Sequence, residues 1–120
     1  MRALCHHTLL EYYGCEPERL RRARAVKSLL CAAVLKGGGK IVKTVFHNFS
    51  PYGVSGVVVI TESHVTIHTW PEHRYAAVDL FYCGGGIRVH KAVDVLRDRF
   101  QPERIKFLVV RRGLQHEVAR

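Results

Sequence analysis

Apolar residues recur along the chain with two different periods, one typical of strands and the other of helices. Short runs rich in β-branched and aromatic residues, bounded by glycine, proline or polar turns, predict strands. Six segments show this pattern: residues 2–13, 40–49, 54–61, 65–70, 75–82 and 105–110. The tail from residue 111 onward is polar, and we expect it to be frayed.

Two other segments carry apolar residues at helical spacing, which predicts helices with one buried face. In residues 18–36 the apolar positions are Leu20, Ala23, Val26, Leu30, Ala33 and Val34. In residues 89–100 they are Val89, Ala92, Val93, Leu96 and Phe100. Three glycines at 37–39 end the first of these helices.

The order of these elements predicts the fold class. Short turns join the strands between residues 40 and 82, and short connections require antiparallel neighbours. Two helices must then cover one face of the sheet. We therefore predict an α+β fold, a two-layer sandwich whose mainly antiparallel sheet is covered on one face by two helices. The 120 residues form a single domain, and the other sheet face is either exposed or buried in a homodimer.

Composition narrows the class of protein. The longest uninterrupted apolar run, residues 29–35, is far too short to span a membrane, and no signal peptide is visible, so we expect a cytoplasmic protein. The net charge of +9 does not come with interleaved aromatic residues, which disfavours nucleic-acid binding as the main function. No pair of cysteines has C-x-x-C spacing, and we predict four free thiols, at Cys5, Cys15, Cys31 and Cys83.

The segment 62–72 crowds a serine, histidines, carboxylates and a tryptophan at the end of an apolar strand. His64 and His68 have the spacing of helical zinc ligands, but β-branched spacers argue against a helix and no third ligand is evident, so we predict no metal. A serine hydrolase is also disfavoured, because the G-x-S-x-G elbow is missing.

A serine between two strands can instead react with its own chain. The hydroxyl of Ser63 would attack the carbonyl of Glu62 and form an ester, and β-elimination would then cut the chain. The dehydroalanine left behind hydrolyses to a pyruvoyl group, which is an electron sink made from the protein itself. The reaction needs a base and hydrogen-bond donors for the oxyanion, and His68 and Ser55 are candidates.

Four sequence blocks carry a resemblance to a known family. They are FSPYGVSG, ESH-x-x-IHTWPE, YAAVD and the Cys-Gly that follows, all within residues 44–84. This region resembles the prokaryotic S-adenosylmethionine decarboxylase proenzymes, and a weaker likeness extends to the first strand and both helices.

The resemblance implies self-cleavage between Glu62 and Ser63, giving a beta chain of 1–62 and an alpha chain of 63–120. The pyruvoyl group from Ser63 would be the cofactor and form a Schiff base with S-adenosylmethionine. Loss of CO2 would give decarboxylated S-adenosylmethionine, which supplies aminopropyl groups for spermidine and other polyamines. By the same resemblance, Ser55 and His68 act in processing, His68 as the proton acceptor.

The resemblance also assigns the substrate contacts. Cys83 matches the catalytic proton donor, Phe49 and Trp70 match residues expected to stack on adenine, and Glu72 matches a carboxylate expected on the ribose. One departure stands in the first strand. The family usually has Gly-x-His there, and this chain has Cys5-His6-His7, which leaves the role of His7 open.

Three alternatives remain at this point. A related self-cleaving scaffold decarboxylates arginine or another basic amino acid, although Trp70 and Glu72 favour a nucleoside. An inactive homologue could instead regulate an active partner by dimerising with it, which the joint presence of Ser63, His68 and Cys83 argues against. A basic nucleic-acid-binding module is the third alternative.

Overall fold

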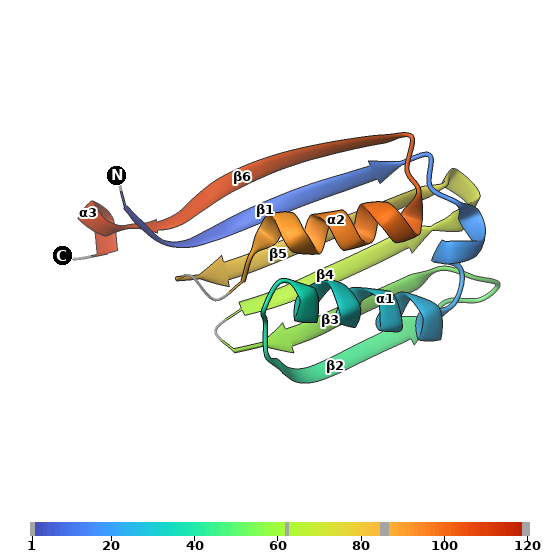
Figure 1. Cartoon of the computed structure of the whole chain (residues 1–120), viewed down its shortest axis with the longest axis horizontal. Coiled ribbons are helices and arrows are strands. Elements are labelled where there is room, and N and C mark those ends of the chain that lie inside the picture. The colour runs from blue at the N-terminus through green and yellow to red at the C-terminus, as the bar shows by residue number, and fades with distance from the viewer. Residues whose placement is uncertain (1, 62, 85–86, 119–120) are drawn as a thin grey trace.

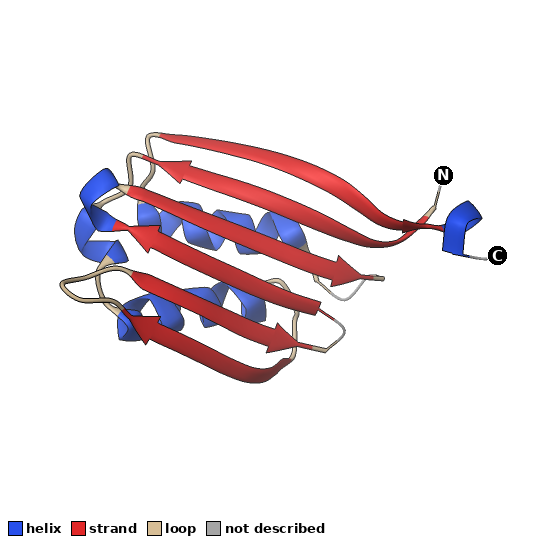
Figure 2. Ribbon diagram, turned by 180° about the vertical axis from the view of Figure 1, so that it is seen from behind, coloured by secondary structure: helices blue, strands red, loops and turns tan. Residues whose placement is uncertain are grey.

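The chain folds into two layers in a computed structural model that describes residues 2–61, 63–84 and 87–118. One layer is a six-stranded antiparallel sheet, and the other is a pair of helices that lie side by side on one face of it (Figure 1). Seen from behind, the opposite face of the sheet has no helix in front of it (Figure 2). The predicted α+β class and two-layer arrangement are confirmed.

The order of the strands across the sheet differs from their order along the chain. They are β1 (Ala3–Tyr13), β2 (Ile41–Asn48), β3 (Val54–Ile60), β4 (Ser63–Trp70), β5 (Tyr75–Cys83) and β6 (Arg104–Leu114). Across the sheet the order is β2-β3-β4-β5-β1-β6, so the first strand lies between β5 and β6. The helices are α1 (Ala23–Lys36), α2 (Val89–Phe100) and the short α3 (Gln115–Val118), with 3-10 helices at Pro17–Leu20 and Pro71–His73.

The first helix begins later than predicted. Residues 17–20 form a separate 3-10 helix, and the backbone of Arg22 is extended before α1 starts at Ala23. The side chain of Asn48, at the end of β2, accepts a hydrogen bond of 2.6 Å from the backbone N–H of Ala23. A side-chain oxygen of β2 thus caps α1. Local periodicity does not reveal this cap, because it comes from a distant segment of the chain.

The predicted frayed tail was wrong. Strand β6 continues to Leu114, where it pairs with Ala3 of β1, and α3 follows directly. Beyond the predicted end, this edge strand contains Arg111 and Arg112, which are exposed. The ladder with β1 satisfies one side of the backbone without needing apolar side chains.

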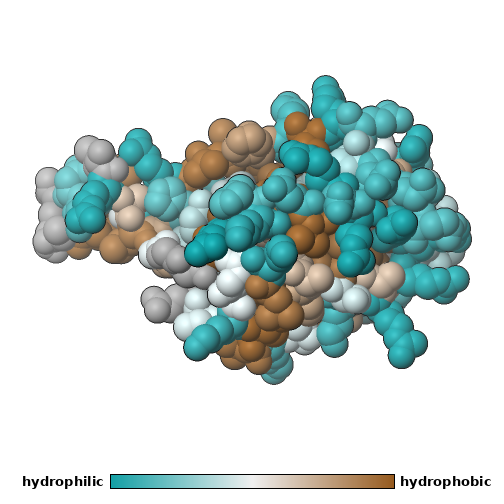
Figure 3. All heavy atoms as spheres, viewed as in Figure 1, coloured by the Kyte–Doolittle hydropathy of each residue, from teal (hydrophilic) through white to brown (hydrophobic). Residues whose placement is uncertain are grey.

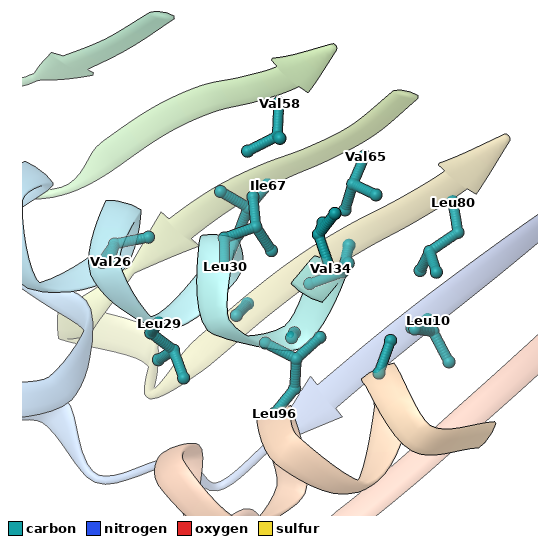
Figure 4. Packing of buried hydrophobic residues seen from close by; sticks show 14 of the residues in the cluster. Leu10, Val26, Leu29, Leu30, Val34, Val58, Val65, Ile67, Leu80 and Leu96 are labelled. Atoms are coloured by element: carbon teal, nitrogen blue, oxygen red, sulfur yellow. The ribbon is translucent and has the colours of Figure 1, made fainter. Parts of the chain in front are cut away.

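The core lies between the helices and the sheet. Leu30 and Val34 of α1 and Leu96 of α2 point toward the sheet, where they meet buried side chains such as Ile67 and Leu80 (Figure 4). The strands contribute one residue in two to this core, as the pleat requires. Among the described residues, no helix has the length and apolar character needed to cross a membrane.

The surface on the helix side is largely hydrophilic. Charged and polar side chains cover most of it, and apolar surface shows along β6, which extends past α2 (Figure 3). Phe107 and Val109, cross-strand partners of Leu10 and Thr8 in β1, are exposed there.

Candidate active site

We call the sheet face that has no helix in front of it the open face (Figure 2). Polar and aromatic side chains lie on it, among them His68, Trp70 and Tyr75. Their strand neighbours alternate with them and are buried under the helices, as in β4, where Val65 and Ile67 are buried. The register of the ladders sets Ser55 of β3 opposite His68 of β4, and Thr66 of β4 opposite Asp79 of β5. The period-two pattern of these strands therefore builds the site.

Ser55 and His68 are in hydrogen-bond contact across β3 and β4. The Oγ atom of Ser55 lies 2.8 Å from Nδ1 of His68, and the pair is exposed on the open face. Imidazole exchanges protons near neutral pH, and a hydroxyl held on one ring nitrogen fixes which nitrogen faces the reaction. The structure thus joins two residues that were predicted separately.

Aromatic groups surround this pair. The ring of Trp70 stacks on that of Tyr75 at 5.3 Å between centroids, and its centroid lies 6.3 Å from that of His68. Trp70 is 39% exposed and Phe49, in the turn after β2, is 49% exposed, so neither belongs to the core. Glu72 is exposed on the turn that follows β4. These positions leave both rings and the carboxylate available to a ligand.

Tyr75 is held in place from the neighbouring strands. Its hydroxyl donates a short hydrogen bond to the carboxylate of Glu11, and its ring also stacks on Tyr13. Burial, followed by the hydrogen bond to Glu11, raises the pKa of Tyr75 above its ordinary value. The phenol therefore stays protonated and acts as a fixed platform behind Trp70.

Ser63 and Cys83 lie at the other end of these strands. The register sets Ser63 opposite the buried Ile60, in phase with the core residues of β4, whereas Cys83 is in phase with the residues of the open face. Ser63 is the first residue of β4 and is half-buried, while Cys83 is the last residue of β5 (Figure 1). His64 pairs with Phe81, so the end of β5 runs alongside the start of β4. Glu62, the other side of the predicted cleavage site, lies outside the described residues.

The predicted site residues are therefore divided between two places. Ser63 and His68 are five positions apart on one strand, and a rise of about 3.3 Å per residue separates them by about 16 Å. We call the end with Ser63 and Cys83 the scissile end, and the end with Ser55, His68, Trp70, Glu72 and Phe49 the histidine end. Within one chain, the proposed base cannot touch the serine that it would serve.

A polar row crosses the open face midway between these ends. Thr66 donates a hydrogen bond of 3.0 Å to Asp79, and Nε2 of His7 lies 3.8 Å from the other oxygen of that carboxylate. This Nε2 atom is buried and makes no hydrogen bond within the part of the chain that the structure describes. His7, whose role the sequence left open, thus belongs to the polar row that lies between the two ends.

The prediction of four free thiols was wrong for two of them. Cys5 of β1 and Cys83 of β5 are direct cross-strand partners and form a disulfide. Cys15 and Cys31 are free, and burial raises the pKa of the Cys15 thiol to about 11. Cys83, the predicted proton donor, is therefore one of the two cysteines in the disulfide.

Two features of the site were missed although one had a signal in the sequence. His68 stands inside the predicted strand 65–70 and Ser63 precedes that strand, so an extended chain already implies their separation. The pairing of Cys5 with Cys83 had no such signal, because nothing local shows that β1 enters the sheet beside β5.

The matches to known proteins agree on one family. The sequence profile of the S-adenosylmethionine decarboxylase family matches residues 6–113. The S-adenosylmethionine decarboxylase proenzyme of Fervidobacterium nodosum is 46% identical over 118 residues, covering 98% of this chain and 86% of that protein. The proenzyme of the same name from Thermotoga maritima is 42% identical, covering 98% of this chain and 91% of its own.

Solved structures show the same fold. The adenosylmethionine decarboxylase from Aquifex aeolicus superposes with a TM-score of 0.86 at 32% identity, covering 95% of this chain and 94% of that one. A Trypanosoma brucei AdoMetDC structure gives a TM-score of 0.66 at 18% identity, which shows likeness of fold alone. That match covers 87% of this chain and 45% of the Trypanosoma brucei chain.

Proposed function

Because this chain belongs to the S-adenosylmethionine decarboxylase family, we propose that it converts S-adenosylmethionine to its decarboxylated form and CO2 in the cytoplasm, for polyamine synthesis. We further propose that it is made as a proenzyme, which cuts itself between Glu62 and Ser63. The observation that carries this proposal is the hydrogen bond between Ser55 of β3 and His68 of β4, the strand whose first residue is Ser63.

The cofactor would be the pyruvoyl group derived from Ser63, whose carbonyl takes up electrons when the substrate loses CO2. The surroundings fit such a group, because Ser63 is half-buried at a strand start and β5 ends beside it. In processing, His68 would accept the proton from the Ser63 hydroxyl while Ser55 holds the imidazole. In decarboxylation, the Cys83 thiol would return a proton to the substrate carbon that lost its carboxylate.

Phe49, Trp70 and Glu72 would bind the nucleoside. Exposed rings suit a flat adenine and the nearby sulfonium, and a carboxylate suits the ribose hydroxyls. The stack of Trp70 on the fixed Tyr75 supports this role, because it holds the indole in one orientation. Arginine has no nucleobase that could stack on these rings. For this reason arginine decarboxylation is only the second candidate function.

The divided site requires a second copy of this chain. In a homodimer, the histidine end of one protomer would serve the scissile end of its partner. Two open faces packed against each other, about a two-fold axis that crosses the strands near Thr66, bring opposite ends together. Apolar residues exposed on this face support such a contact: Val45, Val59, Leu108 and Val110.

Intact-mass analysis and a substrate comparison test the activity. We expect fragments 1–62 and 63–120, the second blocked by a pyruvoyl group, and CO2 release from S-adenosylmethionine but far less from arginine. Replacement of His68 by alanine should slow cleavage about 100-fold or more, because it removes the base. A single unmodified mass after prolonged incubation would refute self-cleavage, and faster turnover of arginine would refute the substrate.

Mixing two inactive variants tests the shared site. Ser63→Ala has no serine to cleave and His68→Ala has no base, so neither should process alone. When the two are coexpressed, His68→Ala chains should be cleaved by the intact histidine of their partners. A Ser63→Ala/His68→Ala double variant is the control, since it supplies no histidine. Absence of cleavage in the mixed dimer, with its formation verified, would contradict a site shared between protomers.

A further inference from the structure

The disulfide between Cys5 and Cys83 lies at the scissile end of the sheet and joins β1 to β5. We propose that it is a reversible redox switch, which turns decarboxylation off by removing the thiol hydrogen of Cys83. The inference rests on the proposed role of Cys83 as proton donor. A sulfur atom bonded to a second sulfur has no hydrogen to return to the substrate.

The positions of the two cysteines favour a bond that forms and breaks. Both are half-buried rather than enclosed in the single chain. They are direct cross-strand partners at one end of the ladder between β1 and β5. Formation of the bond therefore needs no rearrangement of the backbone.

A basic residue stands on the strand beside the disulfide. Arg112 of β6 is the cross-strand partner of Cys5 on its other side, and its guanidinium lies 5.7 Å from the centroid of the Phe81 ring. Positive charge near a cysteine stabilises the thiolate, which is the species that attacks a disulfide. The arrangement thus suits thiol–disulfide exchange.

A purely structural role explains the bond less well. The strands that it joins already pair along nine register positions, from Cys5 with Cys83 to Tyr13 with Tyr75. In the reducing cytoplasm, where we propose that this enzyme acts, disulfides are typically transient and catalytic or redox-sensing. Cys5 also stands where the family resemblance leads us to expect glycine, so this device is a property of this chain.

The step is a balanced exchange with a low-molecular-weight disulfide. The thiolate of one cysteine attacks a sulfur of the small disulfide and releases one small thiol. The second cysteine then attacks the mixed disulfide, forms the Cys5–Cys83 bond and releases the other small thiol. The protein loses two electrons and two protons, the small disulfide gains them, and a dithiol reverses the reaction.

The switch should act on decarboxylation and spare self-cleavage. Processing uses Ser63, His68 and Ser55, none of which is altered by the disulfide. Because Cys5 lies in fragment 1–62 and Cys83 in fragment 63–120, the oxidised enzyme would be cleaved yet still covalently joined. Its two fragments should run as one band on a non-reducing gel and as two bands after reduction.

The experiment compares purified, processed enzyme after treatment with glutathione disulfide or with dithiothreitol. We expect the linked band in the oxidised sample, at least tenfold slower CO2 release from S-adenosylmethionine, and full recovery after reduction. Cys5→Ser, with Cys5→Gly as a second variant, should show two bands and constant activity in both treatments. Cys31→Ser is the matched control, and it should switch as the unaltered enzyme does.

Three results would overturn the inference. They are equal rates from the linked and the reduced enzyme, loss of activity on oxidation of Cys5→Ser as large as in the unaltered chain, and failure of the linked band to form. Failure of the proposed function looks different, because reduced Cys5→Ser would then be uncut or would release no CO2. The thiol count after alkylation still reports the disulfide in that case.

Discussion

Replacement of Thr69 by valine removes one hydroxyl that serves two buried backbone groups. Thr69 is 6% exposed, and its Oγ1 atom donates a hydrogen bond of 2.7 Å to the carbonyl of Leu20. The same oxygen accepts a hydrogen bond of 2.9 Å from the N–H of Val54. Valine matches the shape of threonine, so the substitution leaves no cavity and isolates the loss of these two bonds.

The magnitude follows from the groups that lose their partner. A buried backbone donor or acceptor left unsatisfied costs about 1–3 kcal/mol. With two such groups, we expect the free energy of unfolding to fall by about 3 kcal/mol, a large part of the 5–15 kcal/mol typical of a domain. With a denaturant slope of about 1.5 kcal/mol/M, the urea midpoint should fall by about 2 M.

Urea unfolding followed by circular dichroism measures this loss. The Ser63→Ala background keeps every molecule in one uncut chain, and all variants are compared at one protein concentration because the proposed dimer makes the midpoint depend on it. Thr44→Val is the matched control, because the Thr44 hydroxyl on edge strand β2 makes no hydrogen bond within the described residues, and its effect should stay within about 0.5 kcal/mol. A fall below about 0.5 kcal/mol for Thr69→Val, or an equal fall for both variants, would refute the reasoning.

Three further outcomes are expected from the packing. Gly56→Ala should lower the free energy of unfolding by about 1–3 kcal/mol in the same urea assay, because the added methyl group would overlap the ring of Phe46; an unchanged midpoint would contradict this. The Cys15 thiol should resist a thiol-reactive dye at neutral pH until the chain unfolds, since burial raises its pKa to about 11. Rapid labelling of Cys15 in the native protein, distinguished from Cys31 by peptide mapping, would show otherwise. Because the pKa of Tyr75 is raised, the folded state keeps a proton that the unfolded state loses above about pH 10. The free energy of unfolding should therefore decline above that pH, and it should decline less steeply in Tyr75→Phe. An equally steep decline for that variant would rule out Tyr75 as a source.

Local sequence patterns predicted the elements that depend on local rules. The β-branched runs and short turns gave β3, β4 and β5 as antiparallel neighbours, and the apolar spacing gave α2 with the bounds that the structure has. The residues of the histidine end followed from the resemblance, and the register then showed Ser55 in contact with His68. These parts were predictable because each depends on residues close together in the chain.

The rest depends on pairings between distant segments. The place of β1 between β5 and β6 cannot be read from periodicity, because any apolar strand satisfies the same pattern. The disulfide of Cys5 with Cys83 and the extension of β6 to Leu114 both follow from that placement. The cap on α1 is similar, since Asn48 reaches it from 25 positions away.

The position of β1 has a consequence for the mature protein. Under the proposed cleavage, β1, β2 and β3 belong to one fragment and β4, β5 and β6 to the other, and β1 of the first fragment is inserted between β5 and β6 of the second. Neither fragment can then keep a continuous sheet alone, so the two remain interlocked after the cut. Folding of the uncut chain is a unimolecular event, whereas reassembly of separated fragments would be bimolecular and would depend on concentration. The proposed cut would therefore make maturation a one-way step, because the separated fragments could not refold as one chain.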